Sequence, residues 1–404
     1  MRRRARSTLE RMIDVQPLVD WLVEGAAGAG SPDQILKGTC DGLLRAGVPL
    51  DRAEAFVRTL HPNIAGRSFV WRPGEPVEVK NRSFTDLSTP AFLHSPMAEA
   101  CNTGEYVQLR LDRGEVPPIL LGLAGQGLVD FVAAPMRFLT GQNQVVTFQT
   151  RLASGFGPEH LAAFRRVMPP LSRVGEIYAQ LRTATNLLST YVGRNAGSRI
   201  LRGQIQLGDT DTVKAVIWFS DLRGFTALSR TAQPAAVIRA LNELFGCQIP
   251  PIEKRGGEVL KFIGDGLLAI FPYDGAAGPP AERCAAALDA ASEAFAALES
   301  VNAARRGAGD PAIAFGLALH LGEVSYGNIG GASRMDFTCI GPAVNLAARL
   351  ETVASKLGRP LVVSEAFATT SGRPMELLGH FELKGVDVLQ AAFAPAPPAP
   401  ALAG

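Results

Sequence analysis

An unbroken apolar run at residues 216–219 leads into Asp221 and then into the turn sequence Gly224-Phe225-Thr226. The run predicts a buried strand, and the turn predicts a helix start directly after it. Free backbone N–H groups at a helix start suit a polyphosphate. We interpret the stretch as a metal-bearing phosphate site, although Asp and Gly also form ordinary turns and helix caps.

The composition is that of an ordinary globular protein, with 47% hydrophobic and 19% charged residues in a chain of 404. This length allows two or three domains with a sizeable core. Lys plus Arg (40) nearly balance Asp plus Glu (38), and the net charge is +2. Such a balance gives no electrostatic footprint for nucleic acid, so we expect no nucleic-acid partner.

The cysteines and the first residues indicate in which cellular compartment the protein is expected. The five cysteines are odd in number and form no CxxC pair, which argues against disulfides or a zinc site and favours a reducing cytoplasm. No signal-peptide-like segment follows the basic residues 1–6, so we expect a solvated tail, with weak membrane contact through residues 2–11 as the alternative. The longest charge-free apolar stretch, residues 116–129, is too short to span a bilayer.

The first part of the chain predicts a small α/β domain. Residues 15–46 indicate two short helices broken by glycines, with Ser31 as an N-cap of the second. A helix is expected to begin at about Pro158. Between them, β-prone runs separated by Gly, Pro and Asn predict an antiparallel sheet, at residues 53–60, 67–72, 106–111, 129–136 and 145–151. This order of elements resembles a GAF-type sensor domain over residues 31–168, which implies an unknown small-molecule or protein signal.

A heptad-like pattern follows the expected sensor domain. From Val167 to Val192 the apolar positions advance by alternating steps of four and three, with Thr185 as a polar interruption. The pattern predicts a parallel two-helix coiled coil that joins two copies of the chain. One amphipathic helix packed on its own domain is the alternative. Residues 193–211 then predict a polar, glycine-containing connector.

The rest of the chain predicts an α+β domain, a sheet layered with helices, over residues 212–394. Its β-hairpin is expected to turn at Gly264-Asp265-Gly266, a strong tight-turn signal. The expected helices span residues 234–247, 281–305 and 342–357, and the strands that follow the hairpin span residues 312–321, 334–340, 360–363, 381–384 and 389–393. The Pro/Ala-rich tail, residues 395–404, is expected to be disordered.

The hairpin supplies a second carboxylate, Asp265, which follows Asp221 by 44 residues. Two carboxylates at turns of adjacent strands can share two Mg²⁺ ions, with the Leu222 carbonyl as a further oxygen ligand. Two-metal sites activate an attacking oxygen and stabilise a leaving one. An Asp between two glycines is by itself usually a turn residue, so its meaning depends on what accompanies it.

Three motifs occur in order: Phe219-Ser-Asp221-Leu-Arg-Gly-Phe-Thr226, Lys261-Phe-Ile-Gly-Asp265-Gly266, and a third from Arg334 to Arg349. Together they resemble the catalytic domain of the class III nucleotidyl cyclases, over about residues 212–394. The resemblance implies a ferredoxin-like α+β domain that acts as a head-to-tail homodimer. It also implies composite sites with two Mg²⁺ or Mn²⁺ ions, in which one copy supplies the metal aspartates and the other copy supplies the groups for base and transition state.

The resemblance assigns a role to each matching residue. Asp221 and Asp265 are similar to the two metal ligands, and residues 224–226 are similar to a cradle for the triphosphate. Lys261 and Thr338 resemble the pair that reads the purine and favour ATP, since guanylate cyclases carry Glu and Cys there. In the family, Asn345 orients the ribose and Arg349 stabilises the pentavalent phosphorus, whereas Lys384 resembles a triphosphate lysine. Thr at position 338 is also similar to a bicarbonate-responsive subgroup.

The sequence therefore predicts a sensor-regulated adenylate cyclase that converts ATP to 3′,5′-cyclic AMP and pyrophosphate. A guanylate cyclase and a catalytically silent nucleotide-binding signalling protein are the alternatives. A diguanylate cyclase is disfavoured because Gly256-Gly257 is followed by Glu258-Val259 rather than by that family's signature. We expect an N-terminal segment over residues 1–30, the sensor over 31–168, a helical dimerisation linker over 169–211 and the cyclase domain over 212–394.

Overall fold

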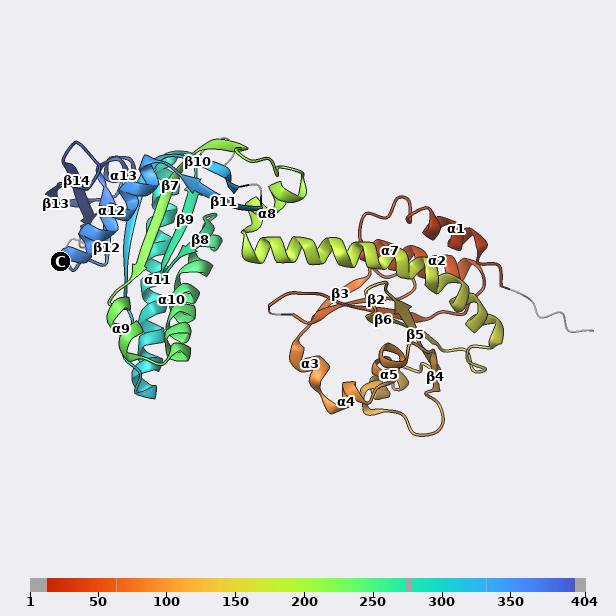
Figure 1. Cartoon of the computed structure of the whole chain (residues 1–404). Coiled ribbons are helices and arrows are strands. Elements are labelled where there is room, and N and C mark those ends of the chain that lie inside the picture. The colour runs from red at the N-terminus through yellow and green to blue at the C-terminus, as the bar shows by residue number, and fades with distance from the viewer. Residues whose placement is uncertain (1–12, 63, 274–277, 332, 397–404) are drawn as a thin grey trace, which may run out of the picture. The chain divides into compact units, whose positions relative to one another are not determined.

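The structure is a computed structural model that describes residues 13–62, 64–273, 278–331 and 333–396. The chain divides into two compact units, residues 1–187 and 188–404, and each unit is described by itself (Figure 1). The expected basic tail and most of the Pro/Ala-rich tail lie outside the described residues. Within them, no helix has the length and apolarity needed to cross a bilayer.

The first unit is built on an antiparallel sheet with the strand order β3-β2-β1-β6-β5-β4. The central strands are paired in long registers, for example Ala134 opposite Val146 and Ala55 opposite Val146. The strands are β1 (Arg52–Arg58), β2 (Gly66–Trp71), β3 (Glu78–Arg82), β4 (Val107–Arg110), β5 (Asp130–Arg137) and β6 (Asn143–Thr150). The predicted antiparallel sheet is therefore present, but the exposed, charged edge strand β3 was not predicted, because its sequence lacks a β-prone apolar run.

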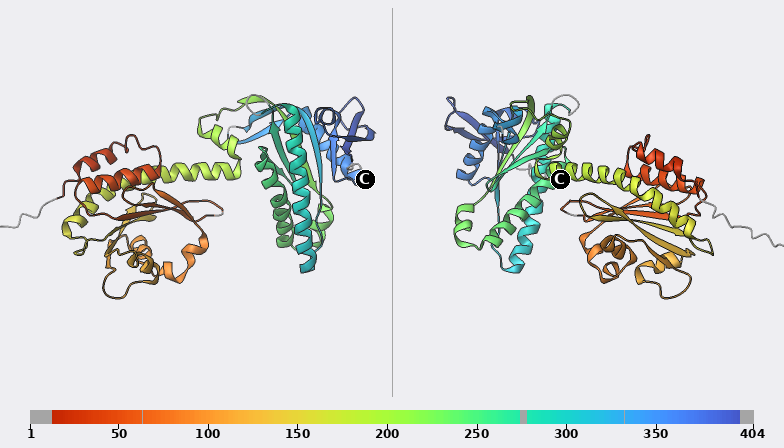
Figure 2. Two further views of the ribbon diagram at one scale, coloured as in Figure 1. Left: turned by 180° about the vertical axis from the view of Figure 1, so that it is seen from behind. Right: turned by 45° about the vertical axis from the view of Figure 1, so that its right-hand side comes forward.

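Helices cover both faces of this sheet. Alternate residues of each strand point to opposite faces, so Phe69, Met136 and Phe148 pack on one face, whereas Phe131 and Ala133 pack on the other. Both views in Figure 2 show the red and yellow-green helices on one face of the sheet and the orange helices on the other. The first face carries α1 (Gln16–Val23), α2 (Pro32–Arg45) and α7 (Pro158–Tyr191), and the second side includes α3 (Phe84–Ser88), α4 (Pro90–Leu93), α5 (Pro96–Thr103), the 3₁₀ turn Pro118–Leu120 and α6 (Leu121–Ala124).

The start of α7 corrects the predicted coiled-coil seam. Val167, Leu171 and Val174 are buried in the core of their own unit, so the first half of the seam is not available to another copy. Further along α7, Leu181 is 55% exposed. The alternative of a helix packed on its own domain therefore holds for the first half, because these residues cover the apolar face of the sheet. Ser31 precedes α2 as predicted, but its side chain makes no capping hydrogen bond.

The second unit contains a sheet with the order β13-β14-β12-β10-β7-β9-β8, and β11 pairs with β10. β10 and β12 are parallel, and a helix lies between them in the chain. Strands β7 (Thr210–Leu222) and β10 (Phe315–Gly331) form its centre. The other strands are β8 (Glu258–Ile263), β9 (Gly266–Pro272), β11 (Arg334–Ile340), β12 (Leu361–Ser364), β13 (Met375–Phe381) and β14 (Gln390–Pro395).

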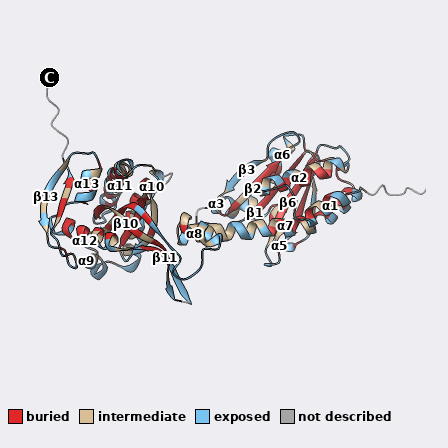
Figure 3. Cartoon of the chain, turned by 90° about the horizontal axis from the view of Figure 1, so that it is seen from above, coloured by how far each residue is buried: buried red, intermediate tan, exposed pale blue. Residues whose placement is uncertain are grey.

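Two helical layers enclose the sheet of the second unit. Trp218 and Leu222 of β7 pack towards α10 and α11, whereas Ala215 and Ile217 pack towards α12. Figure 3 shows the central strands as largely buried, whereas β13, part of β11 and much of the outer helix surface are exposed. The helices are α8 (Arg194–Leu201), α9 (Phe225–Thr231), α10 (Pro234–Lys254), α11 (Pro280–Ala308), α12 (Pro342–Lys356) and α13 (Glu365–Thr370).

Several expected elements of this unit differ in extent. The predicted connector at residues 193–211 is wrong in part, because it contains the helix α8 and the start of β7. The helix α10 continues past Cys247 to Lys254 and includes Pro250 and Pro251 in its last turns. The strand predicted at residues 381–384 lies earlier, as β13, and pairs with β14 at the sheet edge.

Candidate active site

Strand pairing brings the two predicted metal ligands together. Asp221 lies near the end of β7, and Asp265 lies in the turn between β8 and β9. β9 pairs directly with β7, with Leu267 opposite Ser220, so the hairpin turn lies beside the end of β7. The two carboxyl groups are hydrogen-bonded to each other. The prediction that two turns of adjacent strands present their carboxylates together is consistent with this geometry.

A glycine allows the hairpin to approach β7 this closely. A Cβ atom at Gly266 would lie 2.7 Å from the backbone oxygen of Ser220 and 3.4 Å from Asp221 Oδ1. Any side chain at this position would therefore push the hairpin turn away from β7. On the other face of β7, the Ser220 hydroxyl donates to Gln248 Oε1 of α10 at 2.6 Å, which fixes the strand end from behind.

The pair is electrostatically strained when no cation is bound. Burial, the hydrogen bond with Asp265 and the charges of Asp265 and Glu351 raise the pKa of Asp221 to about 7. A hydrogen bond from the Leu222 backbone opposes this rise only in part. Two carboxylates that repel each other in a half-buried site are the donor set that a hard divalent cation neutralises. The residues present therefore fit the predicted metal.

A second acidic group near the pair was not predicted from the sequence. Glu351 of α12 is 8% exposed in its side chain and lies 2.9 Å from Arg223, two residues after Asp221. This is an ion pair by distance only, because Glu351 Oε1 makes no well-directed hydrogen bond within the described residues. A side chain at Gly316 would overlap both charged groups, so the glycine leaves the room for them. Glu351 thus contacts Arg223 of the loop after Asp221.

The backbone around Asp221 contains the other predicted ligands. Leu222 ends β7, and Gly224 follows in a left-handed conformation, with φ of 72°. The helix α9 begins at Phe225, and no side chain caps its first amides. The predicted phosphate cradle, Gly224-Phe225-Thr226, thus lies at a helix start three to five residues after Asp221, as the sequence indicated.

The predicted base-reading residues lie on β8 and β11, which are not paired with each other in the sheet. Lys261 of β8 forms an ion pair with Asp336 of β11 at 3.0 Å. Asp336 and Thr338 are two residues apart on β11, so their side chains point to the same side of that strand. Thr338 is 3% exposed, and its hydroxyl makes no hydrogen bond within the described part of the chain. A buried hydroxyl without a partner is costly, which favours a ligand at this point.

Asn345 and Arg349 lie one helical turn apart on α12, and both are exposed. At 100° per residue, Arg349 is about 200° around the helix from Glu351, and Asn345 is about 240° away. Glu351 faces the carboxylates of its own chain, because its charge acts on Asp221 and Asp265 and its carboxylate contacts Arg223. Asn345 and Arg349 therefore point away from the carboxylate pair of their own chain.

Lys384 is not brought together with the other predicted residues. It is exposed in the turn after β13, and β13 is the edge strand opposite β8 in the sheet order. The lysine borders a shallow hollow formed by its own loop, residues 382–389. Its predicted role in holding the triphosphate has no support from the geometry within one chain.

The described residues contain no cluster of three or more His, Cys, Asp or Glu side chains that would form a metal site from protein ligands alone. Two carboxylates and a backbone carbonyl leave most coordination positions open. Mg²⁺ sites of this kind are completed by water and substrate phosphates. The site is therefore suited to a metal that arrives with, or is shared with, a phosphorylated substrate.

Residues 208–391 match the family model described as the adenylate and guanylate cyclase catalytic domain. This part, just under half of the chain, is similar to adenylate and guanylate cyclase catalytic domains and has the mixed α/β fold described above. An adenylate cyclase of Anabaena cylindrica is similar, with 33% identity over 162 residues, which are 40% of this chain and 32% of that protein. The chain spans about a third of the length of the curated relatives it matches first.

Solved structures of cyclases are also similar. The adenylyl cyclase CyaB from P. aeruginosa is 26% identical, with 47% of this chain and 96% of that chain covered and a TM-score of 0.41. A guanylyl cyclase crystal structure is 29% identical, with 47% and 96% covered and a TM-score of 0.40.

Proposed function

We propose that the protein is an adenylate cyclase that forms 3′,5′-cyclic AMP and pyrophosphate from ATP. The 3′ oxygen of the ribose attacks the α-phosphorus, a new P–O bond forms, and the bond to the pyrophosphate leaving group breaks. The observation that carries the proposal is the contact between Asp221 and Asp265 at adjacent strand ends within a cyclase catalytic domain. A guanylate cyclase is the second candidate, because the matching family model covers adenylate and guanylate cyclases alike.

In this proposal, Asp221, Asp265 and the Leu222 carbonyl hold two Mg²⁺ or Mn²⁺ ions. When bound, such ions polarise the attacking and leaving oxygens and neutralise phosphate charge. The backbone N–H groups of Gly224, Phe225 and Thr226 orient the phosphates beside them. The Arg223–Glu351 pair holds the loop after Asp221 against α12 and so positions the carboxylate pair.

The exposed face of α12 supports a site shared between two copies. Asn345 and Arg349 point away from their own carboxylate pair, so within one chain they do not reach a nucleotide held there. In a head-to-tail homodimer they act on the nucleotide of the other copy, where Asn345 orients the ribose and Arg349 stabilises the charge that develops on phosphorus. Lys384 is retained in this proposal only as a phosphate contact across the same interface.

The pair of Lys261 and Thr338 supports ATP as the substrate. In this proposal the hydroxyl of Thr338, which has no hydrogen-bond partner among the described residues, accepts from the exocyclic amine of adenine, and Lys261 donates to a ring nitrogen after release from Asp336. A guanine would present a carbonyl oxygen where adenine presents the amine. Lys261 and Thr338 therefore favour adenine, each through a hydrogen bond that guanine matches poorly.

The first unit is proposed as a GAF-like sensor. Its support is an antiparallel sheet of β3-β2-β1-β6-β5-β4 order with helices on both faces. The helix α7 leaves this unit and ends at Tyr191, shortly before the catalytic domain begins. A signal bound by the sensor would act on the cyclase through this helix, and the second half of α7 remains the proposed segment for pairing two copies.

Product analysis by mass spectrometry tests the proposal. The full chain is incubated with Mn²⁺ or Mg²⁺ and an equal mixture of ATP and GTP. Cyclic AMP as the main product supports the proposal. An excess of cyclic GMP over cyclic AMP would support the second candidate, a guanylate cyclase. The Asp265→Asn variant is the matched control and should form neither product, while Asp310→Asn, an exposed carboxylate remote from the pair in sequence, should keep the activity. Binding of ATP without any cyclic product would reject an enzymatic role.

A further inference from the structure

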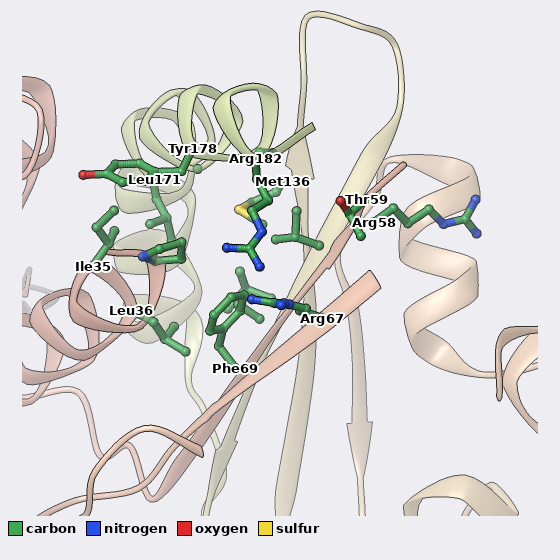
Figure 4. A pocket seen from close by; sticks show the side chains of 16 residues that line it. Ile35, Leu36, Arg58, Thr59, Arg67, Phe69, Met136, Leu171, Tyr178 and Arg182 are labelled. Atoms are coloured by element: carbon green, nitrogen blue, oxygen red, sulfur yellow. The ribbon is translucent and has the colours of Figure 1, made fainter. Parts of the chain in front are cut away.

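The first unit contains a cavity that no predicted role uses. It lies between the sheet and the two helices α2 and α7, with a volume of about 80 Å³. Its walls are aliphatic and aromatic, with Ile35 and Leu36 from α2, Phe69, Met136 and Val146 from the sheet, and Leu171 from α7. Figure 4 shows Ile35, Leu36, Phe69, Met136 and Leu171 around the hollow. A volume of this size is about half that of an apolar cavity that admits benzene, and this cavity opens to the surface.

Two guanidinium groups point into this cavity. Figure 4 shows Arg67 from β2 and Arg182 from α7 reaching towards the same point, whereas Arg58 points away from it. Burial lowers the pKa of Arg67, and the positive charge of Arg182 lowers that pKa further. Arg67 Nε is buried without a hydrogen-bond partner among the described residues. Arg182 is exposed and Arg67 is partly buried, so solvent screens their two charges in part, and an anion at the mouth of the cavity would be attracted by both.

No acidic residue of the described chain compensates this pair. The residues that line the cavity include Arg58, Arg67 and Arg182 and contain no Asp or Glu. Neither Arg67 nor Arg182 takes part in any of the ion pairs found within the described residues. By contrast, Arg52 and Arg82 on the opposite face of the same sheet are both paired with Glu54. The cavity thus combines an apolar interior with an unneutralised cationic rim.

We propose that this cavity is a binding site for a small anionic amphiphile, a carboxylate on a short apolar body. The body fills the space between α2, α7 and the sheet, and the carboxylate accepts hydrogen bonds from Arg67 and Arg182. Charge-assisted hydrogen bonds to a carboxylate are the strong kind, and guanidinium groups suit them geometrically. The alternation of the strands separates this site from the hollow on the other face, which is lined by Glu54, Phe56 and Arg82.

The same helix that binds the ligand is the one that continues towards the catalytic domain. α7 contributes Leu171, Gly175, Tyr178, Ala179 and Arg182 to the cavity. Tyr178 also donates a hydrogen bond to the Ala29 carbonyl at 3.0 Å, which ties α7 to the segment before α2. A ligand in the cavity would therefore contact α7 directly. The binding inference itself does not depend on the proposed cyclase activity.

Calorimetric titration of the full chain tests the site with octanoate as the probe. Octan-1-ol and octylamine have the same chain with a neutral and a cationic head group. We expect one octanoate per chain, with at least about tenfold weaker binding of the alcohol and the amine, since each guanidinium bond to an anion has a large effect on affinity. Equal affinities for octanoate and octan-1-ol, or no saturable octanoate binding, would overturn the proposal.

Variants separate the head-group contacts from the cavity itself. Arg67→Gln and Arg182→Gln should each weaken octanoate binding about tenfold and leave octan-1-ol unchanged, whereas Arg58→Gln, on the rim but pointing away, should have no effect. Ala179→Leu fills the cavity from α7 and should remove binding of both probes. Circular dichroism checks that each variant folds. If Ala179→Leu does not fold, the two arginine variants alone still test the site. Unchanged octanoate affinity in both arginine variants would refute the site.

Discussion

The carboxylate pair of the active site should make the metal-free protein less stable at alkaline pH, and Asp221→Asn should relieve this. In the folded state the pKa of Asp221 is about 7, against an ordinary value of 3.8. Below pH 3.8 the carboxyl is protonated in both the folded and the unfolded state, and the pair does not lower the free energy of unfolding. Between pH 3.8 and 7 the unfolded chain loses the proton that the folded protein keeps, so stability falls as pH rises. Above pH 7 both states have lost the proton, and the free energy of unfolding is lowered by the full amount.

The size of this effect follows from the pKa difference. A shift of about three pKa units corresponds to about 4 kcal/mol for a fully buried group. Asp221 is only about half buried, so solvent screening reduces this figure, and we expect about 2 kcal/mol at pH 8. At pH 5, we expect about one third of this destabilisation, since pH 5 lies only about one unit above the pKa of 3.8 in the unfolded state, whereas the whole shift is about three units. For a unit of this size, about 2 kcal/mol changes Tm by roughly 4–8 °C.

Differential scanning calorimetry of the full chain with a chelator, at pH 5 and pH 8, measures the effect. The transition of the catalytic unit is identified by its shift when Mg²⁺ is added, because a ligand that binds the folded state stabilises it. Asp221→Asn should raise that transition at pH 8 much more than at pH 5, and Mg²⁺ should no longer stabilise the variant. Asp310→Asn, an exposed carboxylate, is the control. A gain that is equal at both pH values, or a loss at pH 8, would refute the electrostatic reasoning.

Three further predictions concern the same site. Asp221→Ala and Arg349→Ala should each abolish turnover, but an equal mixture of the two variants should regain about a quarter of wild-type activity, since half the dimers then contain one intact site. Comparing the turnover of the mixture with that of each variant alone checks this, and no recovery would contradict a shared site. Arg223→Ala should lower the free energy of unfolding by about 3 kcal/mol because it leaves Glu351 buried and unpaired, and urea titration should show that adding Glu351→Gln restores most of it. Gly266→Ala should reduce kcat roughly 100-fold by displacing the hairpin turn from β7, with a folded circular dichroism spectrum; full activity would contradict the close approach.

Much of the fold was predictable because the strong patterns are local. The hairpin at Gly264-Asp265 and the strand at Arg334–Ile340 follow from turn residues and apolar runs, and the structure contains both. β3 was not predicted because Glu78–Arg82 is charged and exposed on an edge, where burial imposes no apolar pattern. The heptad pattern of α7 did not distinguish a partner helix from a sheet, since both require the same apolar stripe.

The site was predictable in its residues but not in its surroundings. Asp221 and Asp265 belong to motifs that contain their own turns, so the sequence indicated that they meet. Glu351 and Arg223 are 128 residues apart in the chain and belong to no common motif. Only the packing of α12 over Gly316 brings them together, and the absence of a side chain at Gly316 was the single signal in the sequence.

The two faces of α12 have a consequence for how the proposed dimer would work. One face contacts the loop that carries Asp221 through Glu351, and the opposite face carries the exposed Asn345 and Arg349, which in the proposed dimer would face the other copy. A rigid helix cannot turn one face without turning the other. Nucleotide binding at one active site would therefore move the Asn345 and Arg349 side chains that act at the other site. The two sites of a dimer would then be coupled directly, and would turn over in concert or in alternation, without any signal from the first unit.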